Sequence, residues 1–307
     1  MSNCIGFFAA AQCSRYCVFY SLPGNARKVS CARRHSRQME HYLDAVALSR
    51  LSQPSSNHDQ KRDFVSIVDG RPDIFGFIAP SDLAKKSYCL VVYLHGMGST
   101  FIEPFVAPHG DPIADRLVNQ DPSVAFLSCN YRDSASWGSD AALTDITQNI
   151  HEICAQYPVE KIVLMGTSMG GCTSLIYSEL APPDIKERIV GVVSVESAGD
   201  LAKLYNEFRG HSIANAMYWA FSGSPEQAPL AYSKRSFIQN LYLLPKRVRI
   251  VEVSAKDDKI VPPHFQHEIV EALQAKQYNV QLIEVDGDHG APPSEIYARG
   301  FDYVKGR

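Results

Sequence analysis

The chain has 307 residues, enough for a substantial core, and α/β folds of ~250 residues often form a single domain. Hydrophobic residues make up 45% of it and charged residues 21%, with 30 Lys and Arg against 33 Asp and Glu. The resulting net charge of −3 offers no basic field for nucleic acid, and no uncharged apolar run approaches the ~20 residues that span a bilayer. The composition therefore predicts a soluble globular protein with no nucleic-acid partner and no transmembrane segment.

The first 39 residues differ from the rest because they hold six basic residues and no Asp or Glu. An Arg-rich, acid-free leader with serines resembles an organelle transit peptide, whereas a secretory signal fits poorly because the apolar stretch at residues 5–11 is short. A disordered tail, or a true start at Met39, are the alternatives. We expect a cytoplasmic protein, with organelle targeting through residues 1–39 as the alternative.

The eight cysteines fall into two groups of four. The group in the leader lacks the paired C-x-x-C signature of a zinc site and consists of Cys4, Cys13, Cys17 and Cys31. The other group lies within apolar runs and consists of Cys89, Cys129, Cys154 and Cys172. This second group predicts buried free thiols in a reducing compartment.

A polar run at residues 53–60 has the composition of a linker, so we place a domain boundary near residue 58. Residues 1–58 are then an N-terminal extension, and residues 59–307 form the single domain that we expect to be catalytic. Short β-rich runs follow at 64–68, 75–78, 90–94, 124–129, 162–165, 189–195, 248–253 and 280–285. Most are continuously apolar, as strands of a parallel sheet covered on both faces must be.

Helical patterns separate these strands. One carries an apolar stripe at 3.6-residue spacing, formed by Leu143, Ile146, Ile150, Ile153 and Tyr157. Asp111 and Pro112 read as the N-cap and first position of a helix that continues over residues 114–119. The alternation predicts an α/β fold with a mostly parallel central sheet flanked by helices.

Residues 201–245 form a connection that is too long for a single crossover. It is rich in aromatic residues, namely Tyr205, Phe208, Tyr218, Trp219, Phe221, Tyr232, Phe237 and Tyr242. We hypothesise a short helical cap that gives apolar walls to a substrate site. The alternative is that these aromatic side chains simply pack helices onto the sheet.

The strongest chemical signal is the segment Gly166-x-Ser168-x-Gly170, which follows an apolar strand and opens a helix. A serine on such a sharp turn occupies a strained backbone conformation, and side chains at positions 166 and 170 would collide with it. The following helix directs its N-terminal dipole toward the hydroxyl. The segment therefore predicts an activated nucleophile at Ser168.

A second strand runs into His95-Gly96-Met97-Gly98. Acyl transfer passes through a tetrahedral oxyanion that needs preorganised N–H donors, and we expect the backbone amides of Met97 and Met169 to supply them. His95 is expected to shape this loop rather than to react.

A serine hydroxyl needs a base, and the base needs an orienting carboxylate. His289 follows an apolar strand near the C-terminus and is the expected general base. The carboxylate is expected in the loop after the preceding strand, at Asp257 or Asp258. Glu196 and Asp200, after an earlier strand, are remote alternatives.

Two pairs of residues nearby are not expected to react. Asp286 and Asp288 flank His289 and are read as loop carboxylates. His264 and His267 are expected on an exposed helix, with no further ligands at compatible positions for a metal.

The ordered set of G-x-S-x-G, an Asp before Val261-Pro262, and Asp288-His289-Gly290 resembles the α/β-hydrolase superfamily in its Ser, Asp, His chain order. The segment from Asn130 to the helix at Asp140 is similar to serine esterases and to the catalytic domain of prolyl oligopeptidases. The resemblance covers about residues 60–307 and implies an α/β-hydrolase fold. In that family the acid usually stands four residues before the proline, which selects Asp258 over Asp257.

The chain departs from the family where a glycine usually begins the acid loop, because Ser254 and Ala255 stand there. The resemblance implies a serine hydrolase that cleaves a small-molecule carboxylic ester without a cofactor. A peptidase or amidase is the nearest alternative, disfavoured because only about 60 residues precede the catalytic region, and an acyltransferase would use the same groups. A non-catalytic small-molecule-binding protein is the alternative from another class.

Overall fold

The computed structural model describes residues 59–106, 111–290 and 292–306. The expected N-terminal extension, its targeting signal and the first four cysteines lie outside the described residues. None of the remaining four cysteines, all in the described residues, is in a disulfide; three of them are buried and Cys154 is half-buried. Burial raises the pKa of Cys129 and of Cys172 to about 12, so these thiols stay protonated at neutral pH.

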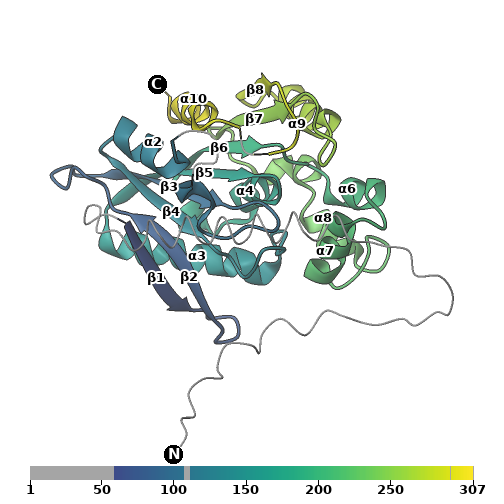
Figure 1. The fold of residues 1–307 in the computed structure, drawn as a ribbon, viewed down its shortest axis with the longest axis horizontal. Coiled ribbons are helices and arrows are strands. Elements are labelled where there is room, and N and C mark those ends of the chain that lie inside the picture. The colour runs from purple at the N-terminus through teal and green to yellow at the C-terminus, as the bar shows by residue number, and fades with distance from the viewer. Residues whose placement is uncertain (1–58, 107–110, 291, 307) are drawn as a thin grey trace, which may run out of the picture. The chain divides into compact units, whose positions relative to one another are not determined.

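Eight strands form one sheet in the order β1-β2-β4-β3-β5-β6-β7-β8 (Figure 1). Their bounds are β1 Asp59–Val65, β2 Pro72–Ile78, β3 Tyr88–Leu94, β4 Val124–Cys129, β5 Val159–Thr167, β6 Ile189–Val195, β7 Arg249–Ala255 and β8 Val280–Val285. The pairs β1/β2 and β2/β4 are antiparallel, and every pair from β4 through β8 is parallel. The carboxyl ends of the parallel strands therefore meet at one edge, where ligands of such sheets bind.

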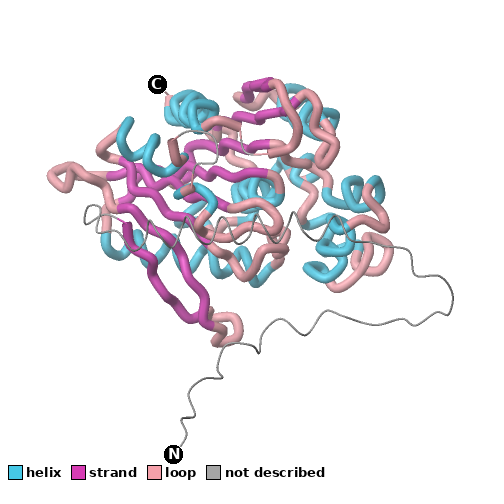
Figure 2. The backbone as a smooth tube through the Cα atoms, in the orientation of Figure 1, coloured by secondary structure: helices cyan, strands magenta, loops and turns pink. Residues whose placement is uncertain are grey.

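Helices cover both faces of the sheet (Figure 2). One face packs on α2 (Ile113–Gln120) and α10 (Ser294–Lys305). The other packs on α3 (Asp140–Gln156), α4 (Met169–Leu180) and α9 (Pro263–Ala275), and the short α5 (Pro183–Lys186) follows α4. Because both faces are covered, β3 and β4 are buried at every residue, as continuous apolar runs require.

The sequence gives most strand positions correctly, and three predicted strands match β4, β6 and β8 residue for residue. The prediction of a strand at 64–68 is wrong at both ends, because β1 runs from Asp59 to Val65. After Val65 the chain turns, with Ser66 N donating to Arg71 O at 2.9 Å and Gly70 at φ 71°. A strand cannot continue through such a turn, and Ile67 is left 73% exposed.

The two helix predictions differ in outcome. Four residues of the predicted apolar stripe, Leu143, Ile146, Ile150 and Ile153, are buried on α3, whereas Tyr157 is the residue that follows its end. The predicted start at Asp111 is wrong by one residue, because α2 begins at Ile113 and Pro112 is its N-cap. Pro112 has extended backbone angles, φ −55° and ψ 143°, which place it just outside the helix.

Residues 201–245 form α6 (Leu201–Glu207), α7 (Ser212–Phe221), α8 (Pro229–Lys234) and the 3₁₀ turns η2 (Phe237–Gln239) and η3 (Leu241–Leu243). These helices lie beside the carboxyl end of β6 (Figure 1). The ring of Tyr232 contacts Tyr205 at 5.7 Å and Phe221 at 4.9 Å between centroids, both edge to face. These aromatic side chains thus pack the helices together, whereas Trp219 and Tyr242 are exposed. The role of this segment as a cap stays a prediction.

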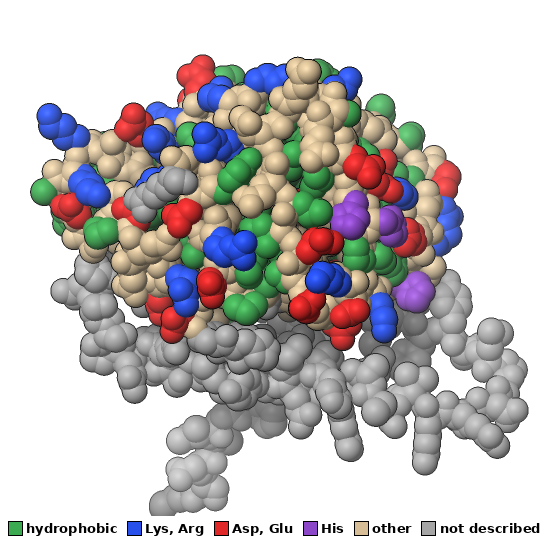
Figure 3. Space-filling view, turned by 90° about the horizontal axis from the view of Figure 1, so that it is seen from above, with side chains coloured by type: hydrophobic (Ala, Val, Ile, Leu, Met, Phe, Trp, Pro, Cys, Tyr) green, Lys and Arg blue, Asp and Glu red, His purple; other side chains and the backbone are tan. Residues whose placement is uncertain are grey.

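On the face shown in Figure 3, acidic and basic side chains of the described residues are interspersed. Within the described part of the chain, no helix is long and apolar enough to cross a membrane.

Candidate active site

Ser168 joins the end of β5 to the start of α4 in an unusual backbone conformation, with φ 54° and ψ −118°. A side chain in this region is strained and persists only where the surroundings hold it. The Ser168 N–H donates to Val195 O at 2.7 Å, which fixes the turn to β6. The hydroxyl is thereby held above the carboxyl edge of the sheet, and the residue is 8% exposed.

The two glycines of the motif have the steric role that the sequence predicted. A β-carbon on Gly166 would stand 2.5 Å from the backbone of Gly170 and 2.7 Å from Leu94 O. One on Gly170 would stand 1.9 Å from Leu94 O. No real β-carbon approaches a backbone atom so closely, so the turn needs glycine at both positions.

His289 lies on the loop between β8 and α10 and faces the serine. Its Nε2 is 3.0 Å from Ser168 Oγ, and its Nδ1 is 2.7 Å from Asp258 Oδ2. The Asp258 side chain is fully buried, and the His289 side chain is 16% exposed. The structure thus brings together the three residues that the sequence singled out, from three separate loops.

Asp258 is oriented by its own loop. Its Oδ1 accepts hydrogen bonds from Ile260 N at 2.8 Å and Val261 N at 2.9 Å, which leaves Oδ2 for the imidazole. Asp257, by contrast, is exposed. Asp286 is also exposed and forms an ion pair with Lys256.

The loop after β3 approaches the serine from the other side. Gly96 N donates to Glu103 Oε2 at 2.9 Å, and Gly98 N donates to Ser134 O at 2.7 Å. Between them, Met97 N has no acceptor among the described residues. Met169 is the first residue of α4, where N–H groups have no acceptor within the helix. Both amides expected to bind an oxyanion are therefore available for a ligand.

His95 is fully buried and supports this loop, as predicted. Its Nδ1 is 2.8 Å from Gly96 O, and its Nε2 is 3.1 Å from Asn130 O. Tyr131 Oη donates to His95 O at 2.6 Å. The loop after β4 therefore holds the Met97 loop in place.

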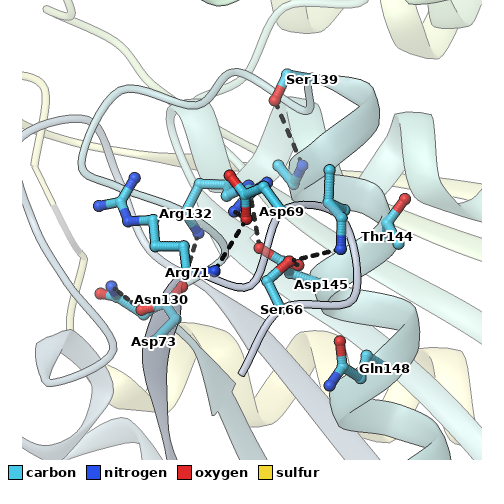
Figure 4. Close-up of polar contacts among 12 residues, drawn as sticks. Ser66, Asp69, Arg71, Asp73, Asn130, Arg132, Ser139, Thr144, Asp145 and Gln148 are labelled. Atoms are coloured by element: carbon cyan, nitrogen blue, oxygen red, sulfur yellow. Dashed lines mark hydrogen bonds and ion pairs between the residues drawn. The ribbon is translucent and has the colours of Figure 1, made fainter. Parts of the chain in front are cut away.

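A network of ion pairs, missed by the sequence analysis, fixes the loop after β4 in turn (Figure 4). Arg132 and Asp145 in this network are buried, whereas Asp69 is exposed. Arg132, at φ 91°, places Nη1 3.0 Å from Asp69 Oδ1 and Nε 3.2 Å from Asp145 Oδ2. Asp145 also accepts from Ser66 Oγ at 2.5 Å, and Asp73 accepts from Arg132 N at 3.1 Å. The network ties the β1–β2 turn to α3. Its members are far apart in the sequence, so no local pattern marks them.

Glu196 and Asp200, the remote alternatives for the acid, have different positions. Asp200 caps α6 by accepting from Ala202 N and Lys203 N. Glu196 is buried, and its Oε2 lies 3.5 Å from His289 Nδ1. Burial raises the pKa of Glu196 to about 7, although the Gly290 N–H and His289 oppose this shift.

Glu196, Asp258 and His289 offer ligand atoms within 4.8 Å of one another, a spacing that could hold a metal ion. The 2.7 Å contact between His289 Nδ1 and Asp258 Oδ2 is a hydrogen-bond distance, so proton sharing accounts for this pair without an ion. His264 and His267 pair with two different carboxylates, Glu207 and Glu284, and do not converge.

A family model described as the alpha/beta hydrolase fold matches residues 127–220. A puromycin hydrolase structure matches with a TM-score of 0.64 and 17% identity, covering 83% of this chain and 41% of its own. A Pyrococcus horikoshii acylaminoacyl peptidase matches with a TM-score of 0.60 and 13% identity, covering 85% of this chain and 42% of its own. A Mycobacterium tuberculosis puromycin-hydrolyzing peptidase matches with a TM-score of 0.60 and 15% identity, covering 81% and 40%.

The chain spans about two fifths of the length of these solved structures. A comparison with curated proteins gave no match by sequence. The strand order, the covering helices and the matched family model agree, and the chain therefore has the α/β-hydrolase fold, as its sequence motifs predicted.

Proposed function

We propose that the chain is a serine hydrolase that cleaves carboxylic acyl bonds through a covalent intermediate on Ser168. The observation that carries this proposal is the continuous contact from Ser168 Oγ to His289 Nε2 at 3.0 Å and from His289 Nδ1 to Asp258 Oδ2 at 2.7 Å. A nucleophile within hydrogen-bond reach of a base, itself oriented by a carboxylate, is the arrangement that activates a serine hydroxyl.

In the first step, Ser168 Oγ forms a bond to the acyl carbon while its proton passes to His289 Nε2. The Met97 and Met169 amides stabilise the negative charge on the former carbonyl oxygen. The tetrahedral intermediate collapses, the bond to the leaving group breaks, and the leaving group takes the proton from Nε2. Asp258 stays ionised and stabilises the imidazolium.

In the second step, water attacks the acyl-serine and gives its proton to His289. A second tetrahedral intermediate forms at the same position, so the same two amides stabilise it. Its collapse releases the carboxylic acid and returns the proton from Nε2 to Ser168 Oγ. The serine and the base are thus regenerated.

We propose carboxylic esters as the substrate class. An alkoxide leaves more readily than an amine, so ester cleavage is the smaller demand on this site. Peptides or amides are the second candidate, favoured by the names of the similar structures, a puromycin hydrolase and an acylaminoacyl peptidase. A matched ester and anilide with the same acyl group separate the two classes by their kcat/KM values.

The test is labelling by a fluorophosphonate with peptide mapping, together with hydrolysis of p-nitrophenyl esters of increasing acyl length. We expect one adduct, on Ser168, and turnover that depends on chain length. Ser168→Ala should lose both while its circular dichroism spectrum stays unchanged. A folded wild-type protein with neither adduct nor turnover would refute the hydrolase and favour the non-catalytic binding role.

A further inference from the structure

Glu196 is the first residue after β6 and has a backbone conformation that glutamate rarely adopts, with φ 52°. Its N–H still donates to Val253 O at 2.8 Å, so the chain stays attached to β7 while it turns. A non-glycine residue in the left-handed region is strained and persists where other contacts hold it. The contacts that Glu196 makes should therefore indicate the role of this strained conformation.

The contacts of Glu196 lead to the loop that carries the histidine. Its Oε2 accepts a hydrogen bond from Gly290 N at 2.9 Å and lies 3.5 Å from His289 Nδ1. The second distance is long for a hydrogen bond but short for an interaction between charges. Two carboxylates, from Asp258 and Glu196, thus face one nitrogen of the imidazole.

Hydrogen bonds to β7 and α9 hold the segment after Glu196 in place. Ser197 Oγ donates to Glu252 Oε1 on β7 at 3.0 Å, and Gln266 Nε2 on α9 donates to Ser197 O at 2.7 Å. These residues are buried. The segment therefore has little freedom to let the Glu196 carboxylate leave the histidine loop.

We propose that Glu196 is a positioning residue for His289, which anchors the histidine loop through Gly290 N and adds a second negative charge beside the imidazolium. The inference rests on the proposed function, because it assigns Glu196 a task in the proton transfer from Ser168. Asp258 holds the ring by a direct hydrogen bond. Glu196 acts on the loop and on the charge.

The titratable groups that interact electrostatically with the Glu196 carboxylate are His289, at 3.5 Å, and Asp258, Glu252 and Tyr297. Burial, followed by the charge of Asp258, raises the pKa of Glu196 to about 7. The carboxylate is therefore charged above this pH and gains a proton below it. Its support of the imidazolium fades as the pH falls through 7.

The experiment compares Glu196→Gln and Glu196→Ala with wild type in the full chain. The amide oxygen of glutamine can still accept from Gly290 N, so Glu196→Gln removes only the charge. We expect it to lower kcat roughly 10-fold with little change in KM, and to move the acidic limb of the kcat/KM profile to lower pH. Glu196→Ala also loses the anchor, and we expect a loss of roughly 100-fold.

Asp286→Asn is the matched control, because it removes an exposed carboxylate from the same loop and should leave kcat and the pH profile as in wild type. If Glu196→Gln keeps the wild-type kcat and profile, the inference is overturned, whatever happens to the stability of Glu196→Ala. If folded wild type forms no adduct on Ser168, the proposed function fails and the inference with it. An adduct with unaffected Glu196 variants overturns the inference alone.

Discussion

The backbone of Gly170, in the first turn of α4, packs against the Leu94 carbonyl oxygen at the end of β3, so that a β-carbon on Gly170 would stand 1.9 Å from this oxygen. The contact joins the turn of the nucleophile to the neighbouring strand. We expect Gly170→Ala to destabilise the fold by about 3 kcal/mol or more, because backbone must move to admit the methyl group. Urea unfolding measures this effect.

Gly210→Ala is the matched control for that variant. Gly210 has φ 88° but nothing within 4 Å of a new β-carbon, so only the backbone strain remains. We expect a loss of about 1 kcal/mol there. Equal losses at the two positions would contradict the argument from steric contact.

The strain at Ser168 predicts a conflict between stability and activity. Ser168→Gly and Ser168→Ala both remove the hydroxyl, but only glycine adopts φ 54° and ψ −118° without strain. We expect the free energy of unfolding of Ser168→Gly to exceed that of Ser168→Ala by about 1 kcal/mol in urea titrations, with both variants inactive. A less stable glycine variant would argue that the conformation is not strained.

Two single variants, Asp258→Asn and Asp257→Asn, test which of these neighbouring aspartates orients His289. Asp258→Asn keeps the shape of the side chain but can hold the wrong imidazole tautomer, so we expect kcat to fall roughly 10³- to 10⁴-fold. Asp257→Asn changes an exposed carboxylate and should stay within about 2-fold of wild type. The kcat values for a p-nitrophenyl ester decide between them, and a large loss at Asp257 would reverse the assignment.

Glu252 predicts a pH dependence of stability. Burial raises its pKa to about 8, so folding favours the protonated form. Its contribution is present in full below the unfolded value near 4.5 and is lost as the pH rises through about 8. Glu252→Gln is neutral at every pH and can still accept from Ser197 Oγ.

We therefore expect the free energy of unfolding of wild type to fall relative to Glu252→Gln between pH 4.5 and about 8, and the difference to stay constant above that range. Urea titrations at pH 5, 6.5 and 9, with the exposed Glu187→Gln as control, measure it. Parallel curves for wild type and Glu252→Gln would show that Glu252 does not titrate as its burial requires.

The pair of Arg132 and Asp145 predicts a strong coupling (Figure 4). Arg132→Met leaves the buried Asp145 carboxylate without its counter-charge, and we expect a loss of about 3–5 kcal/mol. The double variant Arg132→Met with Asp145→Leu removes both charges and should lose less than the sum of the two single variants. Additive losses in this double-mutant cycle would mean that the pair is not coupled.

The sequence by itself determined the fold class, most strands, and Ser168 and His289 of the candidate triad, while a family resemblance selected Asp258 as the third residue. Strands such as β4 and β6 were found because burial on both faces leaves continuous apolar runs, which is a local pattern. The edge strand β8 is only partly buried, but four of its six residues are apolar. Ser168 and His289 were found because each follows a predicted strand. The turn around Ser168 also requires glycines that are close in the chain.

Only the tertiary structure decided which groups face the histidine and what supports them. Asp257 and Asp258 are adjacent in the sequence, and their difference is the direction of each side chain, set by the hydrogen bonds of Ile260 N and Val261 N to Asp258. Glu196 reaches Gly290 across 94 residues, and Arg132 reaches Asp69 across 63. Such contacts depend on the order of strands in the sheet, which brings distant loops to one edge and leaves no periodic signal in the chain.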